Sequence, residues 1–293
     1  MNKILTMAVY ACLGAVPAMG VAASTIDIDQ IHIATTEEYT NGVLDASPYN
    51  PSVEVYGSDL SRVGQISVTL PAGSVLGGGV VPLAPIDSTR SVWYLASGYE
   101  DNYNTLTDLR SDIGTGDYVF QFYDGLGALL DAVTLNYAAP EPTGVPLISY
   151  PSPAAADVPP SGAIITWAYS GTSDGIVVHV ADAAGYSQEA IVQSAVTSWA
   201  PPPLPASASM ELEVRAVDAI GATWDAEGNV ILPQHTTEQG DTFVYAGAFE
   251  HENNMTFTTV PEPASLTLLG LGAGLLVLWR RTAEACPRTP PMR

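Results

Sequence analysis

Apolar and polar residues alternate with a period of two along much of this chain, which is the pattern of β-strands with one buried face. The clearest example runs from Asp117 to Tyr137 and predicts a β-hairpin that turns at Asp124-Gly125. The apolar residues of one face of this hairpin are Tyr118, Phe120 and Phe122 on the first strand and Val133, Leu135 and Tyr137 on the second.

Similar segments, rich in Val, Ile, Thr and Tyr and broken by turn residues, predict further strands in the first half of the chain. The sequence contains no convincing long amphipathic helix. We therefore predict an all-β fold, with a first β-sandwich domain over residues 24–138. Its strand candidates are Thr25 to Ile33, Ser52 to Tyr56, Gln65 to Leu70, Ser91 to Ala96 and Tyr118 to Tyr123.

A proline-rich break without apolar period follows at residues 139–146, so we expect a linker there. The next strand candidates and a proline corner are Pro146 to Ile148, Ile164 to Trp167 with a core tryptophan, Gly175 to Ala181, Ala200 to Leu204 and Met210 to Val217. In this order they resemble a fibronectin type III or related Ig-like module. The resemblance implies a second β-sandwich domain over residues 147–259.

Two details of this second domain can be predicted. The stretch between Val217 and the last strand is too long for a hairpin, and this late insertion is expected to form a ribbon in which Asn229 to Leu232 pairs with Thr242 to Tyr245. The strand before it alternates strictly. Leu212, Val214 and Ala216 are expected to face the core, and Glu211, Glu213 and Arg215 are expected to face out.

Both ends of the chain carry segments that direct a protein to a membrane. Residues 1–23 combine one lysine, an apolar core and a small-residue exit, which predicts a secretory signal peptide. Residues 264–279 are uncharged and mostly apolar, which predicts one transmembrane helix. Arg280 and Arg281 would hold its end on the cytoplasmic side, with residues 282–293 as a cytoplasmic tail.

The predicted helix is preceded by Pro261, Glu262 and Pro263, whose two prolines favour an extended backbone. The tripeptide, the apolar span and the arginine pair over residues 260–281 resemble the C-terminal sorting signal of the PEP-CTERM family, surface proteins of Gram-negative bacteria. The resemblance implies an exported precursor anchored in the inner membrane by this helix. An exosortase, a membrane transpeptidase, would then process it for the cell surface or extracellular matrix. A plain tail anchor and a buried apolar helix are the alternatives.

The tripeptide occurs a second time, at Pro140-Glu141-Pro142. There it is followed by neither an apolar span nor an arginine pair. The context, and not the tripeptide alone, therefore supports the prediction of a sorting signal.

Composition and charge narrow what the exported part can bind. Cys12 lies in the predicted signal peptide and Cys286 beyond the apolar span, so the region between them has no disulfide and no thiol chemistry. Residues 24–260 hold 4 arginines and 29 acidic residues, a formal net charge of 4 minus 29, or −25. This charge disfavours nucleic acid and anionic lipid as direct partners and favours cations.

The densest acidic stretch mixes carboxylates with asparagine and glycine, and oxygen-rich loops of this kind can bind calcium. The stretch does not match an EF-hand loop, and a solvated acidic loop is the alternative. No other cofactor is expected. The candidate calcium ligands are Asp101, Asp108, Asp112 and Asp117.

Aromatic residues flank this acidic stretch and are candidates for stacking on a sugar. They are Trp93, Tyr99 and Tyr103, and exopolysaccharide is the partner that such a surface would suit. A core position is the alternative for Trp93, because its neighbour Tyr94 must face the opposite side of the same strand.

His32, His179, His235 and His251 form no metal-binding pattern, and the sequence has no nucleophile elbow and no phosphate loop. We therefore expect a structural or adhesive role in an exopolysaccharide matrix or biofilm rather than catalysis. The alternative is a secreted enzyme that acts on matrix glycans through the acidic, aromatic loop near residues 93–117.

Overall fold

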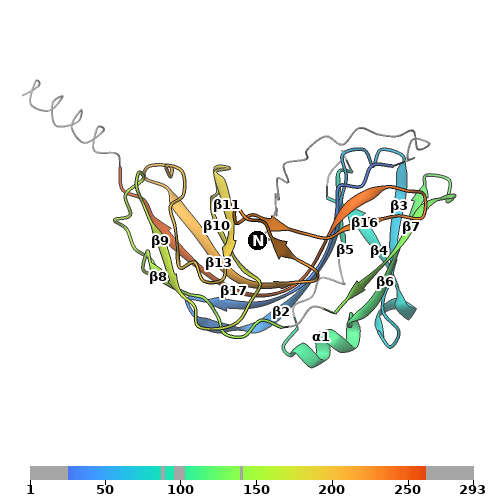
Figure 1. Cartoon of the computed structure of the whole chain (residues 1–293), viewed down its shortest axis with the longest axis horizontal. Coiled ribbons are helices and arrows are strands. Elements are labelled where there is room, and N and C mark those ends of the chain that lie inside the picture. Colours follow the sequence, from blue (N-terminus) through green and yellow to red (C-terminus); the bar gives the residue numbers. More distant parts are fainter. Residues whose placement is uncertain (1–25, 87–89, 96–102, 139–140, 262–293) are drawn as a thin grey trace, which may run out of the picture.

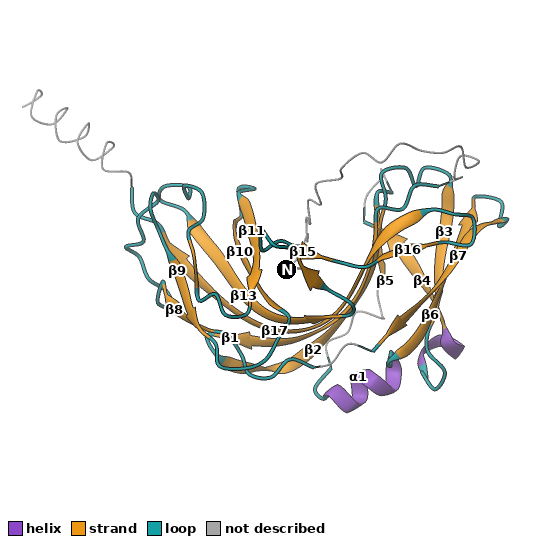
Figure 2. Cartoon of the chain, in the orientation of Figure 1, coloured by secondary structure: helices purple, strands orange, loops and turns teal. Residues whose placement is uncertain are grey.

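A computed structural model describes residues 26–86, 90–95, 103–138 and 141–261. These residues form mostly β-strands, with one short α-helix, so the prediction of a β fold is confirmed (Figure 2). In this part of the chain no helix is long and apolar enough to cross a membrane. The predicted signal peptide and the predicted helix at 264–279 lie outside the described residues.

Most of the strands belong to one large mixed sheet of twelve strands (Figure 1). In chain order they are β1 (Gln30–Thr40), β2 (Val43–Tyr56), β3 (Val63–Thr69), β4 (Val80–Pro85), β5 (Val92–Leu95), β6 (Gly116–Asp124), β7 (Leu129–Tyr137), β10 (Gly175–Asp182), β11 (Ser187–Gln193), β13 (Ser209–Ala219), β16 (Gln234–Thr236) and β17 (Thr242–Thr258). Across the sheet the order is β11-β10-β13-β17-β1-β2-β5-β4-β3-β6-β7, and β16 pairs with one end of β17.

Two small sheets and two short helices complete the described fold. A three-stranded sheet has the order β12-β9-β8, and a two-stranded ribbon joins β14 to β15. These elements are β8 (Leu147–Tyr150), β9 (Ile165–Ala168), β12 (Ser198–Trp199), β14 (Thr223–Trp224), β15 (Val230–Ile231), the α-helix α1 (Leu106–Asp112) and the 3₁₀-helix η1 (Leu76–Gly79).

The long strands β1 and β17 connect the two halves of the molecule. They pair in parallel from Gln30 opposite Val244 to Thr40 opposite Asn254, and β13 pairs with β17 on its other side. The sheet therefore runs without interruption through both regions predicted as separate sandwiches, and its two ends rise on either side of the long strands (Figure 1). The predicted boundary between two domains stays a prediction.

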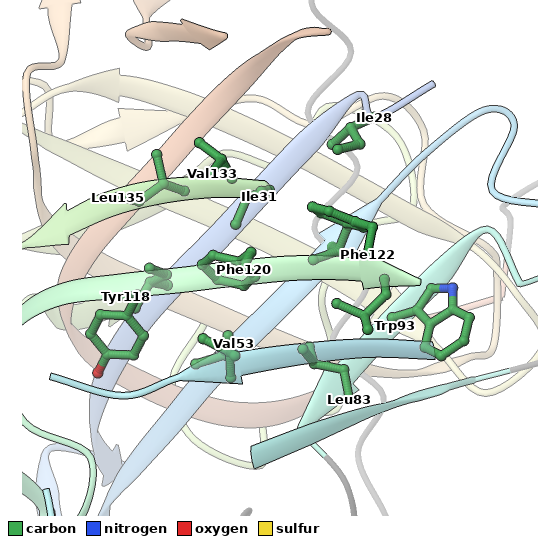
Figure 3. Packing of buried hydrophobic residues seen from close by; sticks show 14 of the residues in the cluster. Ile28, Ile31, Val53, Leu83, Trp93, Tyr118, Phe120, Phe122, Val133 and Leu135 are labelled. Atoms are coloured by element: carbon green, nitrogen blue, oxygen red, sulfur yellow. The ribbon is translucent and has the colours of Figure 1, made fainter. Parts of the chain in front are cut away.

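The first hydrophobic core is formed by residues of strands β1 to β7 and of the first part of β17. Figure 3 shows Phe120 and Phe122 of β6 packed among residues of other strands, including Ile31 of β1 and Val53 of β2. Tyr137 at the end of β7 donates a hydrogen bond to the backbone carbonyl of Ala248 in β17, at 2.8 Å. The predicted hairpin is confirmed, since β6 and β7 pair in the register that its alternation requires.

The second hydrophobic core lies between the three-stranded sheet and strands β10, β13 and β17. Trp167 of β9 is 3% exposed in this core, as predicted. Leu212, Val214 and Ala216 of β13 are fully buried there, which confirms the predicted inner face.

The prediction for the outer face of β13 is wrong in one respect. Glu213 and Arg215 do lie on the face opposite the core, but they are only 3% and 2% exposed. The reason is that Glu189 of β11 and Glu250 of β17 pack against Arg215 from both sides, so this face is covered by charged side chains instead of water.

The predicted ribbon of the late insertion is also wrong. Val230–Ile231 pairs with Thr223–Trp224, because Asp225 accepts a hydrogen bond from the backbone N–H of Asn229 at 2.7 Å and closes a tight turn between them. Residues 242–244 pair instead with β16. The last part of the predicted insertion is in fact the first part of β17, which is 17 residues long.

Candidate functional site

The end of β17 leads directly to the predicted sorting tripeptide and is held firmly in the fold. Thr259 is buried, and its hydroxyl donates to the carbonyl of Pro205 at 2.5 Å and accepts from the backbone N–H of Ala208 at 2.9 Å. The backbone N–H of Val260 donates to the carbonyl of Val158 at 3.0 Å. The main chain is therefore anchored on both sides up to residue 260.

Pro261 follows this anchored segment and is exposed. It is the last described residue, and the other predicted sorting residues, Glu262, Pro263, Arg280 and Arg281, lie outside the described part of the chain. The tripeptide thus begins at the surface, directly after Val260, whose backbone is still hydrogen-bonded to the fold.

The predicted calcium ligands have separate local contacts. Asp108 accepts a hydrogen bond inside the first turn of α1, Asp112 ends the same helix, and Asp117 accepts from the side-chain N–H of Asn136 at 2.7 Å. Asp101 lies outside the described residues. Among the residues that are described, no group of three or more His, Cys, Asp or Glu side chains is arranged to hold a metal ion. Calcium binding stays a prediction.

Of the three aromatic residues predicted to stack on a sugar, one is buried in the fold and one is half-buried. Trp93 is 2% exposed in the first core, where its indole N–H donates to the carbonyl of Arg90 at 3.0 Å. Trp93 therefore occupies a core position, the alternative to a surface role, and its ring is not available to stack on a sugar. Tyr103 is half-buried and forms an isolated β-bridge with Tyr49. Tyr99 lies outside the described residues.

A buried ionic cluster lies on the sheet face opposite the second core. Its centre is Arg215, whose Nη1 lies 3.1 Å from Oε2 of Glu250 and whose Nη2 lies 3.4 Å from Oε2 of Glu189. Glu213 and Glu252 are also close enough to act on its charge. We call these five residues the Arg215 cluster. Strands β10, β11, β13 and β17 bring its members together, because alternate residues of neighbouring strands share a face.

Four carboxyl groups around one guanidinium exceed what one positive charge can neutralise. Burial opposes the charge of Arg215, but the surrounding carboxylates, first Glu250, outweigh it and raise its pKa further. Burial and the neighbouring Glu213 raise the pKa of Glu252 to about 8, although Arg215 acts in the opposite direction. The Glu252 carboxyl therefore keeps its proton at neutral pH, which lowers the repulsion inside the cluster.

Two histidines form buried pairs with glutamates. Nε2 of His251 lies 2.9 Å from Glu37, and its Nδ1 lies 3.0 Å from the carbonyl of Gly144. Burial opposes the charged form of His251, but these acceptors outweigh it and raise the pKa. His32 lies 3.7 Å from Glu54, which is ion-pair distance but too long for a hydrogen bond. Its pKa is also raised, because Glu54 outweighs the opposing effect of burial.

This arrangement is suited to holding strands together. Arg215 is paired with Glu189 and Glu250, every member of the cluster except Glu189 is at most 5% exposed, and the two histidines are buried beside their own glutamates. The sequence did contain one signal that was missed. The run from Glu250 to Asn254 is entirely polar, and these residues lie within the long strand β17. Arg215 is one of only four arginines between residues 24 and 260.

The sequence comparison decides the assignment of the C-terminus. The model of the PEP-CTERM protein-sorting motif matches residues 259–281. The chain carries a PEP-CTERM sorting motif. The resemblance noted from residues 260–281 is therefore confirmed. The motif implies processing by an exosortase and an exported, membrane-sorted protein.

No curated protein matches the chain as a whole. Solved structures show distant likeness only. A biofilm associated protein BSP domain has 13% identity and a TM-score of 0.22, with 80% of this chain and 30% of that chain covered. The chicken CNTN1 FN1-FN3 domains have 12% identity and a TM-score of 0.21, with 81% and 65% covered.

A tetra-tandem repeat in the extending region of a large adhesion protein has 17% identity and a TM-score of 0.18, with 76% of this chain and 49% of that chain covered. The chain thus spans between 30% and 65% of the length of these structures.

The PEP-CTERM motif overlaps the folded body by three residues. Thr259 and Val260 are bonded to neighbouring loops, and Pro261, the last described residue, extends beyond them. The described structure therefore contains the start of the motif, which reaches the surface at Pro261.

Proposed function

We propose that this protein is exported, is processed by an exosortase through its PEP-CTERM motif, and then serves as a structural or adhesive component of an exopolysaccharide matrix or biofilm. The role is not enzymatic, and exopolysaccharide is its partner. The two hydrophobic cores act as two sandwich-like units that share their longest strands.

The continuity between motif and fold supports this proposal most directly. The motif begins immediately after β17, the strand that contributes to both hydrophobic cores. Because β17 is paired along its length with β1 and β13, cutting the chain after Pro261 would leave every one of these pairings intact. A processed protein would keep its fold and lose only its membrane segment.

Charge and covalent structure support a place in a hydrated matrix. The region 24–260 has a formal net charge of −25 and no cysteine. Such a charge keeps copies of the protein apart in water and concentrates cations around them. A matrix held by hydrated polysaccharide and cations is compatible with both properties.

The test is the intact mass of the protein recovered from the surface of a host that has an exosortase. The proposal predicts a product that has lost the residues after the Pro261 region. Replacing Pro261 and Pro263 with alanine should leave the full-length precursor in the membrane. The matched control replaces Pro140 and Pro142, the second copy of the tripeptide, and should be processed normally.

Two results would contradict the proposal. Retention of all residues through Arg293 in the native protein would make it a plain membrane-anchored protein. Normal processing of the Pro261 and Pro263 variant would remove the role of the tripeptide. Purified surface protein should also bind matrix polysaccharide without shortening it, and release of shorter sugars would favour the glycan-active enzyme instead.

A further inference from the structure

Strands β11, β10 and β13 lie side by side at one edge of the main sheet and bring together a serine, a histidine and a glutamate (Figure 1). His179 of β10 lies directly opposite Glu213 of β13, and Ser187 of β11 lies diagonally opposite His179 on its other side. Residues two apart on a strand share a face, so all three side chains project from the face opposite the second core. We call these three residues the Ser187 triad.

The contacts in the Ser187 triad follow the order hydroxyl, imidazole, carboxylate. Nε2 of His179 lies 2.9 Å from Oγ of Ser187, and Nδ1 of the same ring lies 3.4 Å from Oε2 of Glu213. Glu213 is buried, the side chain of His179 is 13% exposed, and Ser187 is exposed. A reagent in solution can therefore reach the serine, while the sheet holds the ring and the carboxylate behind it.

The buried carboxylate determines which ring nitrogen of His179 carries the proton. A carboxylate only accepts hydrogen bonds, so Nδ1 must carry the hydrogen that it shares with Glu213. In the neutral ring Nε2 then has a free lone pair and accepts from the hydroxyl of Ser187. This is the arrangement in which a histidine takes the proton of a serine while the serine attacks a carbonyl carbon.

The charges around His179 favour the protonated ring that such an attack produces. Glu213 lies beside Nδ1, and Glu189, directly opposite His179 on β11, is close enough for the two charges to interact. Arg215 lies 3.4 Å from Glu189 and offsets part of this effect. The carboxylates on two sides of the ring stabilise a positive charge on it.

The turn before β11 holds Ser187 in place and uses its own backbone donors to do so. Oδ1 of Asp182 accepts from the backbone N–H of Ala184 at 2.9 Å and from that of Tyr186 at 2.8 Å. These nearby N–H groups are therefore not free to stabilise a carbonyl oxygen that becomes negative, which supplies much of the rate of acyl-transfer enzymes. The triad is suited to one reaction with an acyl donor that is already activated, and not to repeated hydrolysis of stable esters.

We propose that Ser187 is a site of covalent acylation by an activated ester or thioester. Oγ of Ser187 attacks the carbonyl carbon, and Nε2 of His179 takes the hydroxyl proton. The bond from the carbonyl carbon to the leaving oxygen or sulfur breaks, and the leaving group takes that proton from Nε2. The products are an acyl ester on Ser187 and a free alcohol or thiol, and Glu213 positions the ring. The reaction occurs once per chain, gives a structural protein a covalent attachment point, and does not depend on the sorting motif.

The test treats the purified full chain with p-nitrophenyl acetate. Each transfer of an acetyl group releases one p-nitrophenolate, which absorbance measures. Cleavage after aspartate and glutamate releases residues 183–189, and fragmentation in the mass spectrometer distinguishes an acetyl group on Ser187 from one on Tyr186. We expect acetylation of Ser187 to be at least about tenfold faster than that of Ser61, an exposed serine whose hydroxyl donates to Asp59 at 2.6 Å and not to a histidine.

Variants of the three residues make the test specific. His179→Gln removes the base and should slow acetylation of Ser187 about tenfold or more. Glu213→Gln keeps an acceptor for Nδ1 whereas Glu213→Leu removes it, so acetylation should be slower in the leucine variant, an order that a purely structural role of Glu213 would not produce in two folded variants. Ser187→Ala changes an exposed side chain, so it remains informative if the buried variants fail to fold, and it should abolish the rapid release of p-nitrophenolate. The matched control Ser61→Ala should leave that release unchanged.

Four results would overturn the proposal. Acetylation of Ser187 that is no faster than that of Ser61 shows that the hydroxyl is not activated. An unchanged rate at Ser187 in folded His179→Gln removes the histidine as the base. Undiminished release of p-nitrophenolate by Ser187→Ala, with the acetyl group on His179, makes the ring the nucleophile. Release of more than one equivalent per chain, above that of Ser187→Ala, shows repeated turnover and not a single acylation.

Discussion

Arg215 is the residue on which the buried charges depend. It is 2% exposed and faces four glutamates, two of them within 3.4 Å. Charges in such a place are costly unless they are paired, so the cluster contributes little net stability but becomes strongly unfavourable when one sign is removed. The guanidinium is close enough to all four glutamates for their charges to act on it.

We predict that Arg215→Met lowers the free energy of unfolding by about 3 to 5 kcal/mol, because it leaves buried carboxylates without a counter-charge. Denaturant unfolding measures this. The matched control is Arg110→Met, since Arg110 pairs with Glu141 at 3.5 Å but both side chains are more than 40% exposed. It should change stability by less than about 1 kcal/mol. Equal effects of the two substitutions would contradict the prediction.

Glu252 makes this cluster sensitive to pH. Burial and Glu213 raise its pKa to about 8 in the folded protein, while Arg215 opposes them and Glu38 and Glu250 add to them. In the unfolded chain the pKa is close to the ordinary value for Glu. The folded state therefore binds the proton more tightly, and this group's contribution to stability is complete below about pH 4.5 and is lost as pH rises to about 8.

We predict that Glu252→Gln removes part of this pH dependence. The amide imitates the protonated carboxyl, so the variant should match the native protein near pH 4.5 and become more stable than it as pH approaches and passes 8. Melting temperatures across this range would show the difference. A variant that is less stable than the native protein at pH 8 would contradict a protonated Glu252.

At this scale the sequence predicted where side chains point better than what surrounds them. The alternation of Leu212, Val214 and Ala216 identified the buried face correctly, because a row of apolar residues on one side of a strand indicates burial. The charged residues between them are compatible with two environments, exposure to water or ion pairing in the interior. Only the neighbouring strands, which come from distant parts of the chain, distinguish them.

At the scale of elements, the chain between the two cores is held by a close backbone contact. Thr143 forms a β-bridge with Thr172, and its hydroxyl accepts from the backbone N–H of that residue at 2.9 Å. A Cβ on Gly171 would lie 1.4 Å from the carbonyl oxygen of Thr143. Glycine is needed at this position for space, since its φ angle is not in the left-handed region.

We predict that Gly171→Ala lowers the free energy of unfolding by about 1 to 3 kcal/mol, because the segment around Thr143 must move away from its partner. Gly125→Ala is the control, since no heavy atom lies within 4 Å of its added Cβ. Its effect should be small. Thermal unfolding of both variants tests this, and similar melting temperatures would show that the contact does not constrain the chain.

Local signals explain which elements could be predicted. The β6–β7 hairpin was predicted because its alternation and its turn at Asp124-Gly125 are neighbours in sequence. The length of β17 was missed, since residues 246–254 are buried on both faces and show no alternation. The ribbon of the late insertion was assigned to wrong partners for a similar reason, because the turn at Asp225 depends on one side-chain contact.

At the scale of the whole molecule, the signal at the end of the chain could be predicted and the path of the sheet could not. The PEP-CTERM motif is contiguous, so its order of tripeptide, apolar span and arginines is visible in the sequence. The parallel pairing of β1 with β17 joins segments more than 200 residues apart. Nothing in the local sequence of either strand specifies its partner, so the continuous sheet could not be predicted from the sequence.

The continuous sheet leads to a prediction about cooperativity. Phe243 and Tyr245 of β17 pack in the first core, whereas Met255 and Phe257 of the same strand pack in the second. Loss of either core would therefore release a strand that the other core requires. We predict that the two cores unfold in one transition, which calorimetry on the purified protein would show as equal calorimetric and van't Hoff enthalpies.

Two core substitutions make this prediction stringent. Phe120→Ala opens a cavity in the first core and Leu212→Ala opens one in the second, each at a cost of about 2 to 5 kcal/mol. The chain has five tryptophans, so the measurement uses two variants that each keep one of them: Trp93 reports on the first core and Trp167 on the second. Each substitution should shift both signals together, because the strands are shared. If each substitution moved only the signal of its own core, the molecule would consist of two independent sandwich domains, and the shared strands would serve only as a connection.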